Sequence, residues 1–484
     1  MTDAAEWVPR DGLVVVVKRG CPTCNTVLPA LVELREARRD LVVVTQDDPA
    51  FPEGLGAIFD EDLRGSHRLG IEVVPTLVER VAGENRRVAI GWNREEWQEL
   101  SRVSDLAPDL PAARPGCGAL NLEEPHASRL AELDSRPLSA RAVGLGDDED
   151  PIEACFTRGW SDGLPVVPPT AQRVRRMLTG TARPPDELVA VVPPDYASAT
   201  VEKVAINAVM AGCLPEHLPV VLACVEAACT EEFNWHGLAA TTYFSGPVVV
   251  VNGPIRRQLG MSWGINALGQ GNRANLTIGR ALQLTLRNVG GARPGEVDRA
   301  TLGNPGKLSF CFAENEEGSP WEPLAQARGV AAGRSAVTLF AGEGPRGVVD
   351  QLSREPESLS RSLAMALRTV AHPKLPLGFD AMLVVTPEHG RVFREAGWTR
   401  QKLERRLLEL LQIPAREMIR GAGGCAEGVP ASMFEDSESS TIPKFRPGGL
   451  LLVHAGGGAG LFSAIIGGWI NGEGGSQPLT REIQ

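Results

Sequence analysis

The chain has 484 residues, 43% hydrophobic and 23% charged, which is the composition of a globular protein with two or three domains. Its formal net charge of −11 at pH 7 argues against nucleic acid as a partner, because nucleic-acid-binding proteins present a basic face. Residues 1–6 lack the basic and apolar regions of a secretory signal, and the uncharged stretch Leu450–Trp469 is rich in glycine. We therefore expect a cytoplasmic protein without a membrane segment.

Two of the nine cysteines form the motif Cys21-Pro22-Thr23-Cys24, between the apolar run Leu13–Val17 and a helix expected over Asn25–Arg38. A cysteine at the start of a helix is stabilised as a thiolate, and a second cysteine three positions on can resolve a mixed disulfide. Half of a zinc site is the alternative, but a structural zinc needs a second Cys/His pair and no other C-x-x-C occurs. The motif therefore predicts dithiol–disulfide chemistry. The odd number of cysteines fits a reducing compartment.

After the motif, the pattern of apolar residues predicts alternating strands and helices. The expected strands are Leu41–Thr45, Ile71–Val78 and Val88–Ile90, and the expected helices are Asp60–Leu69 and Arg94–Leu100. Pro75 interrupts the second strand and marks an edge, a bulge or a turn, because proline has no backbone N–H to donate.

Residues 10–103 resemble the thioredoxin/glutaredoxin-like fold, through the Cys-Pro-Thr-Cys motif after the first strand and through Val74-Pro75-Thr76-Leu77 before a hairpin. The resemblance implies that Cys21 is the attacking thiol, Cys24 the resolving thiol and Pro75 a cis-proline beside the dithiol. Arg19-Gly20 precede the motif where many thioredoxins carry an aromatic residue, so the redox potential is left open. A thioredoxin-like fold used only for docking is the alternative.

Residues 104–150 contain several prolines and the acidic cluster Asp147–Asp150, which is typical of an extended or partly ordered linker. Cys117 lies in Pro115-Gly116-Cys117-Gly118, a flexible and exposed context. It is either a third thiol that meets the dithiol or an incidental cysteine, and the sequence alone favours the second.

Residues 151–484 are expected to form a larger α/β domain, with a further break near residue 330 if it divides into two subdomains. Its apolar runs are Pro247–Val251, Leu308–Phe312, Ala336–Phe340, Ala381–Val385 and Leu450–Val453, each followed by a polar or glycine-rich turn. Uninterrupted apolar runs are typical of strands buried on both faces, and helices between them indicate a mainly parallel sheet.

Ligands of such sheets bind at the carboxyl ends of the strands. The polar residues expected at this rim are Asn252, Glu314, Asn315, Glu316, Glu343, Glu388, His389 and His454. Glu314, Glu316 and His454 are the catalytic candidates. Asn252, Asn315 and His389 are candidates for substrate binding.

Two further binding candidates come from other segments. His236 follows Asn234-Trp235. Arg273 lies just before the helix expected over Leu276–Asn288, where a guanidinium could clamp a carboxylate or phosphate. The glycine-rich stretch Gly456–Gly460 could also hold an anion if Leu461–Ile466 is helical.

Cys213 and Cys425 lie in glycine turns, so both are expected to be exposed and to be the thiols that the dithiol would reduce. Residues 151–484 also loosely resemble a bacterial group associated with UGSC-type (seleno)proteins. The segments that carry this resemblance are Trp160–Thr170, Asn207–Pro219, Ala313–Leu324 and Ala455–Glu482. The Gly-Ser-Cys motif of that group is absent, and only Gly212-Cys213 and Gly424-Cys425 approach it.

These features predict a thiol-dependent redox enzyme. Cys21 and Cys24 would supply electrons to a small-molecule or thiol substrate held by the larger domain, or would release a thiol-bound intermediate from it. An external thiol or reductase would recharge the dithiol, and the chain is compatible with a homo-oligomer. One alternative is a hydrolase or lyase that uses the rim carboxylates and histidines, through a metal ion in one version, with the dithiol regulating it. The other is a non-catalytic, redox-responsive assembly protein.

Overall fold

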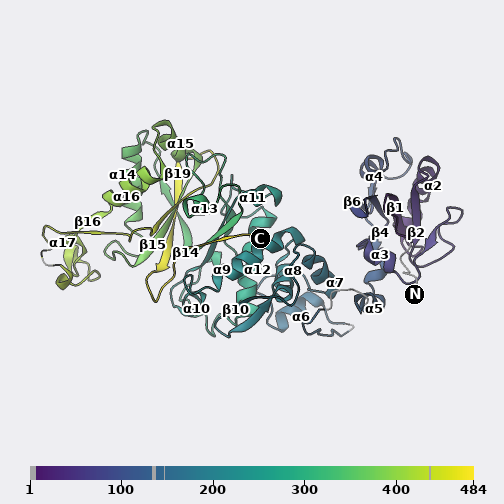
Figure 1. The fold of residues 1–484 in the computed structure, drawn as a ribbon, viewed down its shortest axis with the longest axis horizontal. Helices are drawn as coiled ribbons and strands as arrows, with labels where there is room; N and C mark the ends of the chain where they lie inside the picture. Colours follow the sequence, from purple (N-terminus) through teal and green to yellow (C-terminus); the bar gives the residue numbers. More distant parts are fainter. Residues whose placement is uncertain (1–6, 133–137, 147, 435, 437) are drawn as a thin grey trace. The chain divides into compact units, whose positions relative to one another are not determined.

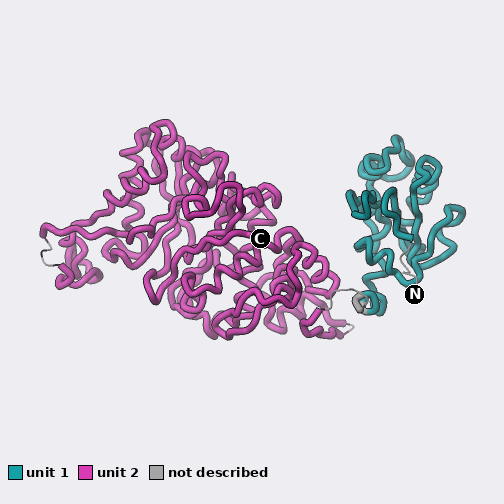
Figure 2. The backbone as a smooth tube through the Cα atoms, viewed as in Figure 1, with its two compact units in different colours: residues 1–137 teal, residues 138–484 magenta. Residues whose placement is uncertain are grey.

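A computed structural model describes residues 7–132, 138–146, 148–434, 436 and 438–484. The chain forms two compact units, residues 1–137 and residues 138–484, which Figure 2 colours separately. Both contain helices and sheets, so the protein belongs to the α/β class (Figure 1). Within the described ranges, no helix combines the length and the apolar character that crossing a bilayer requires.

Unit 1 is built on a five-stranded mixed sheet. Its strands are β1 (Gly12–Val17), β2 (Leu41–Thr45), β3 (Ile58–Phe59), β5 (Thr76–Val81) and β6 (Glu84–Ile90), in the order β3-β2-β1-β5-β6. β1 pairs parallel with β2 and antiparallel with β5. Residues 13–17 of β1 are fully buried, as the run of valines predicts for a central strand covered on both faces.

Four helices accompany this sheet: α1 (Pro22–Thr26), α2 (Leu28–Ala37), α3 (Arg64–Arg68) and α4 (Arg94–Ser101). The helix expected over residues 25–38 is therefore divided at Val27, which caps both α1 and α2. Leu31 and Leu34 of α2 and Trp97 of α4 are buried in the same core as β1.

The first part of the segment expected to be a linker, residues 104–132, instead packs within unit 1, whereas residues 138–150 belong to unit 2. β8 (Ala113–Arg114) pairs with β7 (Trp92–Asn93), and β9 (Cys117–Gly118) pairs with β4 (Val73–Val74). The indole nitrogen of Trp92 donates to the carbonyl of Pro111 at 2.7 Å. The short helices η1 (Leu120–Leu122) and α5 (His126–Glu132) follow. The proline-rich composition concealed this packing because the apolar residues that anchor it, among them Leu106 and Ala119, lie in short apolar pairs that are too brief to predict an element.

Unit 2 contains a seven-stranded sheet. In spatial order its strands are β13 (Cys311–Ala313), β12 (Gly246–Asn252), β14 (Ala336–Val349), β19 (Phe462–Ile470), β15 (Phe379–Val385) and β18 (Leu450–His454), and β20 (Leu479–Glu482) also pairs with β14. β12 and β13 precede residue 330 and β14 follows it, so the unit does not divide there.

The expectation of a mainly parallel sheet was wrong. Only the pairs β12–β13 and β15–β18 are parallel, while β14 and β19 run antiparallel to each of their neighbours. Composition could not reveal this, because a strand buried on both faces has the same apolar residues in either direction. The stretch expected as helix, Leu461–Ile466, lies largely in β19, and this strand separates β14 from β15.

Unit 2 also contains helices along its whole length (Figure 1). They are α6 (Pro151–Thr157), α7 (Ala171–Leu178), α8 (Val201–Ala211), α9 (Leu218–Ala228), α10 (Trp235–Ala240), α11 (Ile255–Gln258), α12 (Arg273–Asn288), α13 (Leu324–Ala327), α14 (Pro356–Leu367), α15 (Pro387–Glu395), α16 (Arg400–Leu410) and α17 (Ala415–Met418). Two small hairpins complete the unit, β10 (Leu188–Val192) with β11 (Ala197–Thr200), and β16 (Gln412–Pro414) with β17 (Thr441–Pro443).

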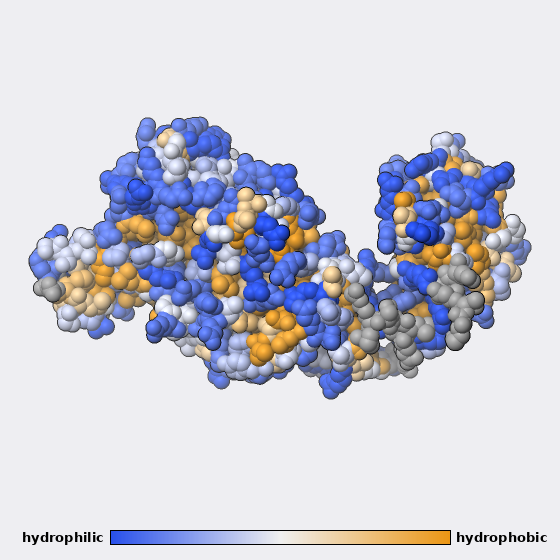
Figure 3. Space-filling view, in the orientation of Figure 1, coloured by the Kyte–Doolittle hydropathy of each residue, from blue (hydrophilic) through white to orange (hydrophobic). Residues whose placement is uncertain are grey.

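Alternate residues of the central strands enter different cores. Val249 and Val251 of β12 pack with α8, α9 and α12, whereas Val248 and Val250 pack with Phe312 and with residues of β15 and β18. The sheet is therefore buried on both faces. Hydrophilic side chains cover most of the visible surface of unit 2 and apolar areas interrupt it (Figure 3), as is normal for a globular protein.

Candidate functional sites

The dithiol lies where β1 gives way to α1. Cys21 is the N-cap residue of α1, and its sulfur accepts a hydrogen bond from the backbone N–H of Cys24 at 3.4 Å. Pro22 occupies the first helical position, where its missing N–H costs nothing. Both cysteines are fully buried, and the sulfur of Cys24 accepts from the backbone N–H of Lys18 at 3.5 Å.

The two thiols differ in acidity. Burial raises the pKa of Cys21, but hydrogen bonds from the Cys117 thiol and from the backbone N–H of Cys24 outweigh it, so the pKa lies below the ordinary value of 9.0. Burial raises the pKa of Cys24 far above that value, and the neighbouring Cys21 thiolate adds to the rise. Of the two thiols, Cys21 is therefore the one that ionises more readily.

Pro75 lies beside the dithiol, as the resemblance implies. The Val74–Pro75 peptide bond is cis. In its thiol form, Cys21 donates a hydrogen bond to the carbonyl of Val74 at 3.3 Å. The structure also brings Cys117 to this site, because β9 pairs with β4 and places Cys117 opposite Val74.

In unit 2, three of the expected rim residues meet. The side-chain amide of Asn252 donates to Glu314 Oε2 at 2.7 Å and to Glu316 Oε1 at 2.9 Å. Arg256, which the sequence reasoning missed, is buried beside them. Its guanidinium pairs with Glu316 at 2.8 Å and with Glu317 at 2.9 Å. The signal that could have identified it is its place four residues after Asn252, directly beyond the turn that ends β12.

Further contacts hold the cluster of Asn252, Arg256, Glu314 and Glu316 together. Arg256 donates to the backbone carbonyl of Glu314 at 2.7 Å and lies over the ring of Trp263. Glu314 is fully buried and accepts from the backbone N–H of Leu324 at 2.7 Å. Burial raises the pKa of Glu314, and the guanidinium of Arg400 at 3.6 Å works against the rise. The carboxylates of Glu314 and Glu316 therefore connect the ends of strands to neighbouring loops, and their oxygens are already hydrogen-bonded within the protein.

The two rim histidines are buried. Burial, with the nearby charge of Arg394, lowers the pKa of His454 to about 4, so its ring is neutral at pH 7. Neither of its ring nitrogens has a hydrogen-bond partner in the described part of the chain. His389 uses both nitrogens, with Nδ1 2.8 Å from Ser463 Oγ and Nε2 3.0 Å from the carbonyl of Asp350. His389 thus joins α15 to β19.

The remaining rim candidates have structural contacts. Asn315 Oδ1 accepts from the backbone N–H of Gly318 at 2.9 Å, and Glu388 accepts from that of Leu461 at 2.6 Å. Glu343 does not follow a strand, because β14 continues to Val349, and it accepts from the hydroxyl of Tyr243 at 3.1 Å.

His236 and Arg273 lie on other elements. His236 is exposed on α10, with Nδ1 3.0 Å from the hydroxyl of Tyr196. Arg273 begins α12 and donates to the carbonyl of Gly212 at 2.9 Å. The guanidinium expected to bind an anion therefore donates through Nε to a backbone carbonyl.

The two cysteines in glycine turns differ. Cys213 was expected to be exposed but is buried, because the end of α8 packs against α12 and its thiol donates to the carbonyl of Thr277 at 3.3 Å. Burial raises the pKa of Cys213 to about 12. Cys425 is partly exposed, and its sulfur lies 3.7 Å from Nε2 of His372.

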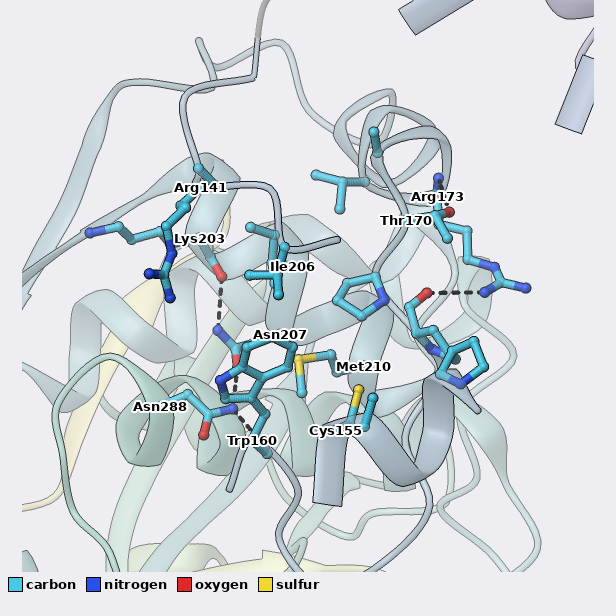
Figure 4. A pocket seen from close by; sticks show the side chains of 18 of the residues that line it. Arg141, Cys155, Trp160, Thr170, Arg173, Lys203, Ile206, Asn207, Met210 and Asn288 are labelled. Atoms are coloured by element: carbon cyan, nitrogen blue, oxygen red, sulfur yellow. Dashed lines mark hydrogen bonds between the residues drawn. The ribbon is translucent and has the colours of Figure 1, made fainter. Parts of the chain in front are cut away.

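The sequence did not indicate a cavity of about 760 Å³ in unit 2, which α6, α7, α8 and residues 138–145 enclose (Figure 4). This volume is in the range of ligand pockets. Its apolar wall includes Cys155, Trp160, Ile206 and Met210 (Figure 4). Five separate parts of the chain build the cavity, since Asn288 and Val289 at the end of α12 also line it, so no single motif indicates it.

The polar groups of the cavity are fixed by one another or by the backbone. Asn288 donates to Asn207 Oδ1 and to the carbonyl of Trp160, both at 2.9 Å. The two lining acids are also engaged, since Glu202 accepts from the backbone of Ser139 and Ala140, and Asp150 caps α6.

The cations of the cavity wall are Arg141, Arg173 and Lys203. Arg173 and Lys203 also donate to the backbone carbonyls of Pro168 and Ser198, at 3.0 and 2.7 Å. With the lining acids committed to backbone donors, the charge of these cations makes the cavity compatible with a ligand that has an apolar body and a negative charge.

Within the described ranges, no three or more His, Cys, Asp or Glu side chains form a group that could hold a metal ion. Comparison of the chain with protein-family models and with curated proteins finds no match.

Proposed function

We propose that unit 1 is a thioredoxin-like dithiol domain and that the protein is a thiol–disulfide oxidoreductase. The observation that carries the proposal is the pair of unlike thiols, with the pKa of Cys21 lowered by hydrogen bonds and the pKa of Cys24 raised by burial. The strand order around β1 and the position of the cis Val74–Pro75 bond beside Cys21 support the thioredoxin-like assignment.

In the proposed reaction, the Cys21 thiolate attacks one sulfur of a substrate disulfide. The substrate S–S bond breaks, a Cys21–substrate disulfide forms, and the other substrate sulfur leaves as a thiolate. Formation of the mixed disulfide removes the negative charge from Cys21, so Cys24 can lose its proton more easily. The Cys24 thiolate then attacks Cys21 Sγ. A Cys21–Cys24 disulfide forms, and the second substrate thiolate leaves with the proton. Two electrons pass from the dithiol to the substrate, and an external thiol or reductase restores them.

The experiment that tests this proposal is reduction of oxidised glutathione by the pre-reduced full chain. The expected result is two glutathione thiols released per chain as Cys21 becomes disulfide-bonded. Oxidised glutathione that stays intact beside unmodified Cys21 would contradict the proposal.

We also propose that the cavity of unit 2 binds the small molecule on which the chain acts, and that this molecule is an anion with an apolar body. The cations Arg141, Arg173 and Lys203 around an apolar wall support this class. The hydrolase alternative gains less support, because Glu314 and Glu316 are held by Asn252 and Arg256.

Replacing Ile206 by tryptophan should fill the cavity and weaken binding of the anionic apolar probe 1-anilinonaphthalene-8-sulfonate. We expect about tenfold weaker binding, or about 1.4 kcal/mol, measured by probe fluorescence. Leu352→Trp is the matched control, because Leu352 is 90% exposed and lies outside the cavity wall. Equal binding by the two variants would show that the probe does not enter this cavity.

A further inference from the structure

A segment of unit 1 lies across the dithiol. Its β9 strand runs antiparallel to β4, with Cys117 opposite Val74 and Gly118 opposite Val73. On the other side, the hydroxyl of Thr23, inside the Cys-x-x-Cys motif, donates to the carbonyl of Pro115 at 2.6 Å. The segment Pro115–Gly118 is thus attached both to α1 and to the strand before Pro75.

Gly116 makes this close approach possible. A Cβ atom at this position would lie 2.3 Å from Cγ1 of Val73 and 2.5 Å from the carbonyl oxygen of Val74. Real Cβ atoms do not come so close to backbone oxygens, so only glycine lets the segment pair with β4 at this distance. The position of Cys117 beside Val74 therefore depends on glycine at position 116.

The segment brings the thiol of Cys117 to the thiols of Cys21 and Cys24. The carbonyl of Val74 accepts from Cys21, and Val74 is the residue that Cys117 faces in the β4–β9 register. The Cys117 and Cys21 thiols interact, and this interaction lowers the pKa of Cys21 and raises the pKa of Cys117. Cys21 and Cys24 are fully buried, whereas Cys117 is partly exposed. A thiol reagent from solvent therefore meets Cys117 first.

We propose that Cys117 is a third redox cysteine, which exchanges with Cys21 so that the oxidised protein holds a Cys21–Cys117 disulfide in equilibrium with Cys21–Cys24. This inference rests on the proposed thiol–disulfide function of the same site. It gives the oxidised form a disulfide with one sulfur at the surface, where an external thiol can reduce it.

The exchange conserves atoms and electrons. The Cys117 thiolate attacks Cys21 Sγ of the Cys21–Cys24 disulfide, the Cys21–Cys117 bond forms, and the Cys21–Cys24 bond breaks. The electron pair leaves on Cys24, which takes the proton that Cys117 lost. No external oxidant enters this step, because reduction of the substrate disulfide has already oxidised the site.

The test uses the full chain carrying Cys24→Ser, treated with oxidised glutathione and digested without reduction for mass spectrometry. The expected product is a peptide pair joined through Cys21 and Cys117, with glutathione released. Cys24→Ser combined with Cys117→Ser should instead retain glutathione on Cys21. Adding Cys229→Ser, a partly exposed cysteine at the end of α9, is the control that should leave the Cys21–Cys117 bond unchanged.

The unsubstituted chain, oxidised in the same way, gives a second measurement that does not depend on the Cys24→Ser variant. It should yield both the Cys21–Cys24 and the Cys21–Cys117 peptides. A stable glutathione adduct on Cys21 of Cys24→Ser, with only Cys21–Cys24 in the unsubstituted chain, would overturn the role of Cys117 and leave the oxidoreductase proposal intact. Cys21 unmodified in every variant would overturn both.

Discussion

Replacing Cys21 by serine should slow the reduction of oxidised glutathione by the full chain on the order of a thousandfold or more, because it removes the nucleophile itself. A serine hydroxyl stays protonated in this setting and cannot attack a disulfide. The measurement is a stopped reaction of the pre-reduced chain, followed by mass analysis of the thiols that remain. Cys24→Ser should keep the first attack, because it leaves Cys21 in place.

The pH dependence of the same reaction tests the acidity of Cys21, and Cys229→Ser is the control. The pKa of Cys21 is lowered, so the rate should rise with pH as the thiolate forms and level off at a lower pH than it would for an ordinary cysteine thiol. Cys229→Ser should leave both the rate and its pH profile unchanged, since this cysteine lies in unit 2 at the end of α9. A Cys21→Ser variant with the parent rate would remove Cys21 from the reaction.

The second large effect concerns the stability of unit 2. Arg256→Ala should destabilise the folded state by about 3–5 kcal/mol, because it leaves the Glu316 and Glu317 carboxylates without their buried partner. It also removes the donor to the carbonyl of Glu314. Hydrogen exchange of peptides from β12 and β13, followed by mass spectrometry, measures the loss in this part of the chain.

Arg257→Ala is the matched control for this prediction. Arg257 is 63% exposed and shares only Glu317, so its removal should cost less than about 1 kcal/mol. Burial raises the pKa of Glu317, but Arg256 and Arg257 outweigh it and lower the pKa to about 2. A carboxyl with a lowered pKa stabilises the fold above its ordinary value of 4.5, and this contribution is lost as the pH falls toward 2. The difference between the two variants should therefore shrink over that range, and equal destabilisation at pH 7 would contradict the account.

The sequence predicted the elements that depend on local patterns. The valine run predicted the strand that the structure contains as β1, and the resemblance to the thioredoxin/glutaredoxin-like fold implied the cis Val74–Pro75 bond that the structure also contains. Ala381–Val385 also lies in a strand close to the expected boundaries, β15. Continuous apolar runs and helix periodicity are local signals, so these elements could be predicted from neighbouring residues.

What the sequence could not predict depends on contacts between distant segments. Cys117 seemed incidental because glycine and proline around it indicate flexibility, and only its pairing with Val74 brings it to the dithiol. The direction of β14 and β19 is set by the order in which the chain returns to the sheet. Cys213 is buried because α12 covers its turn, which its glycine and proline neighbours do not reveal.

The central claim is that the thiols around Cys21 form a reversible two-electron couple, and a redox titration tests it most directly. The full chain is equilibrated in glutathione buffers of graded potential, alkylated and mapped by mass spectrometry. We predict one two-electron transition in which Cys21 loses its thiol together with Cys24 or Cys117, while the fully buried Cys224 keeps its own. Cys21 that stays reduced across the whole series, or that is oxidised without a partner in unit 1, would contradict the account.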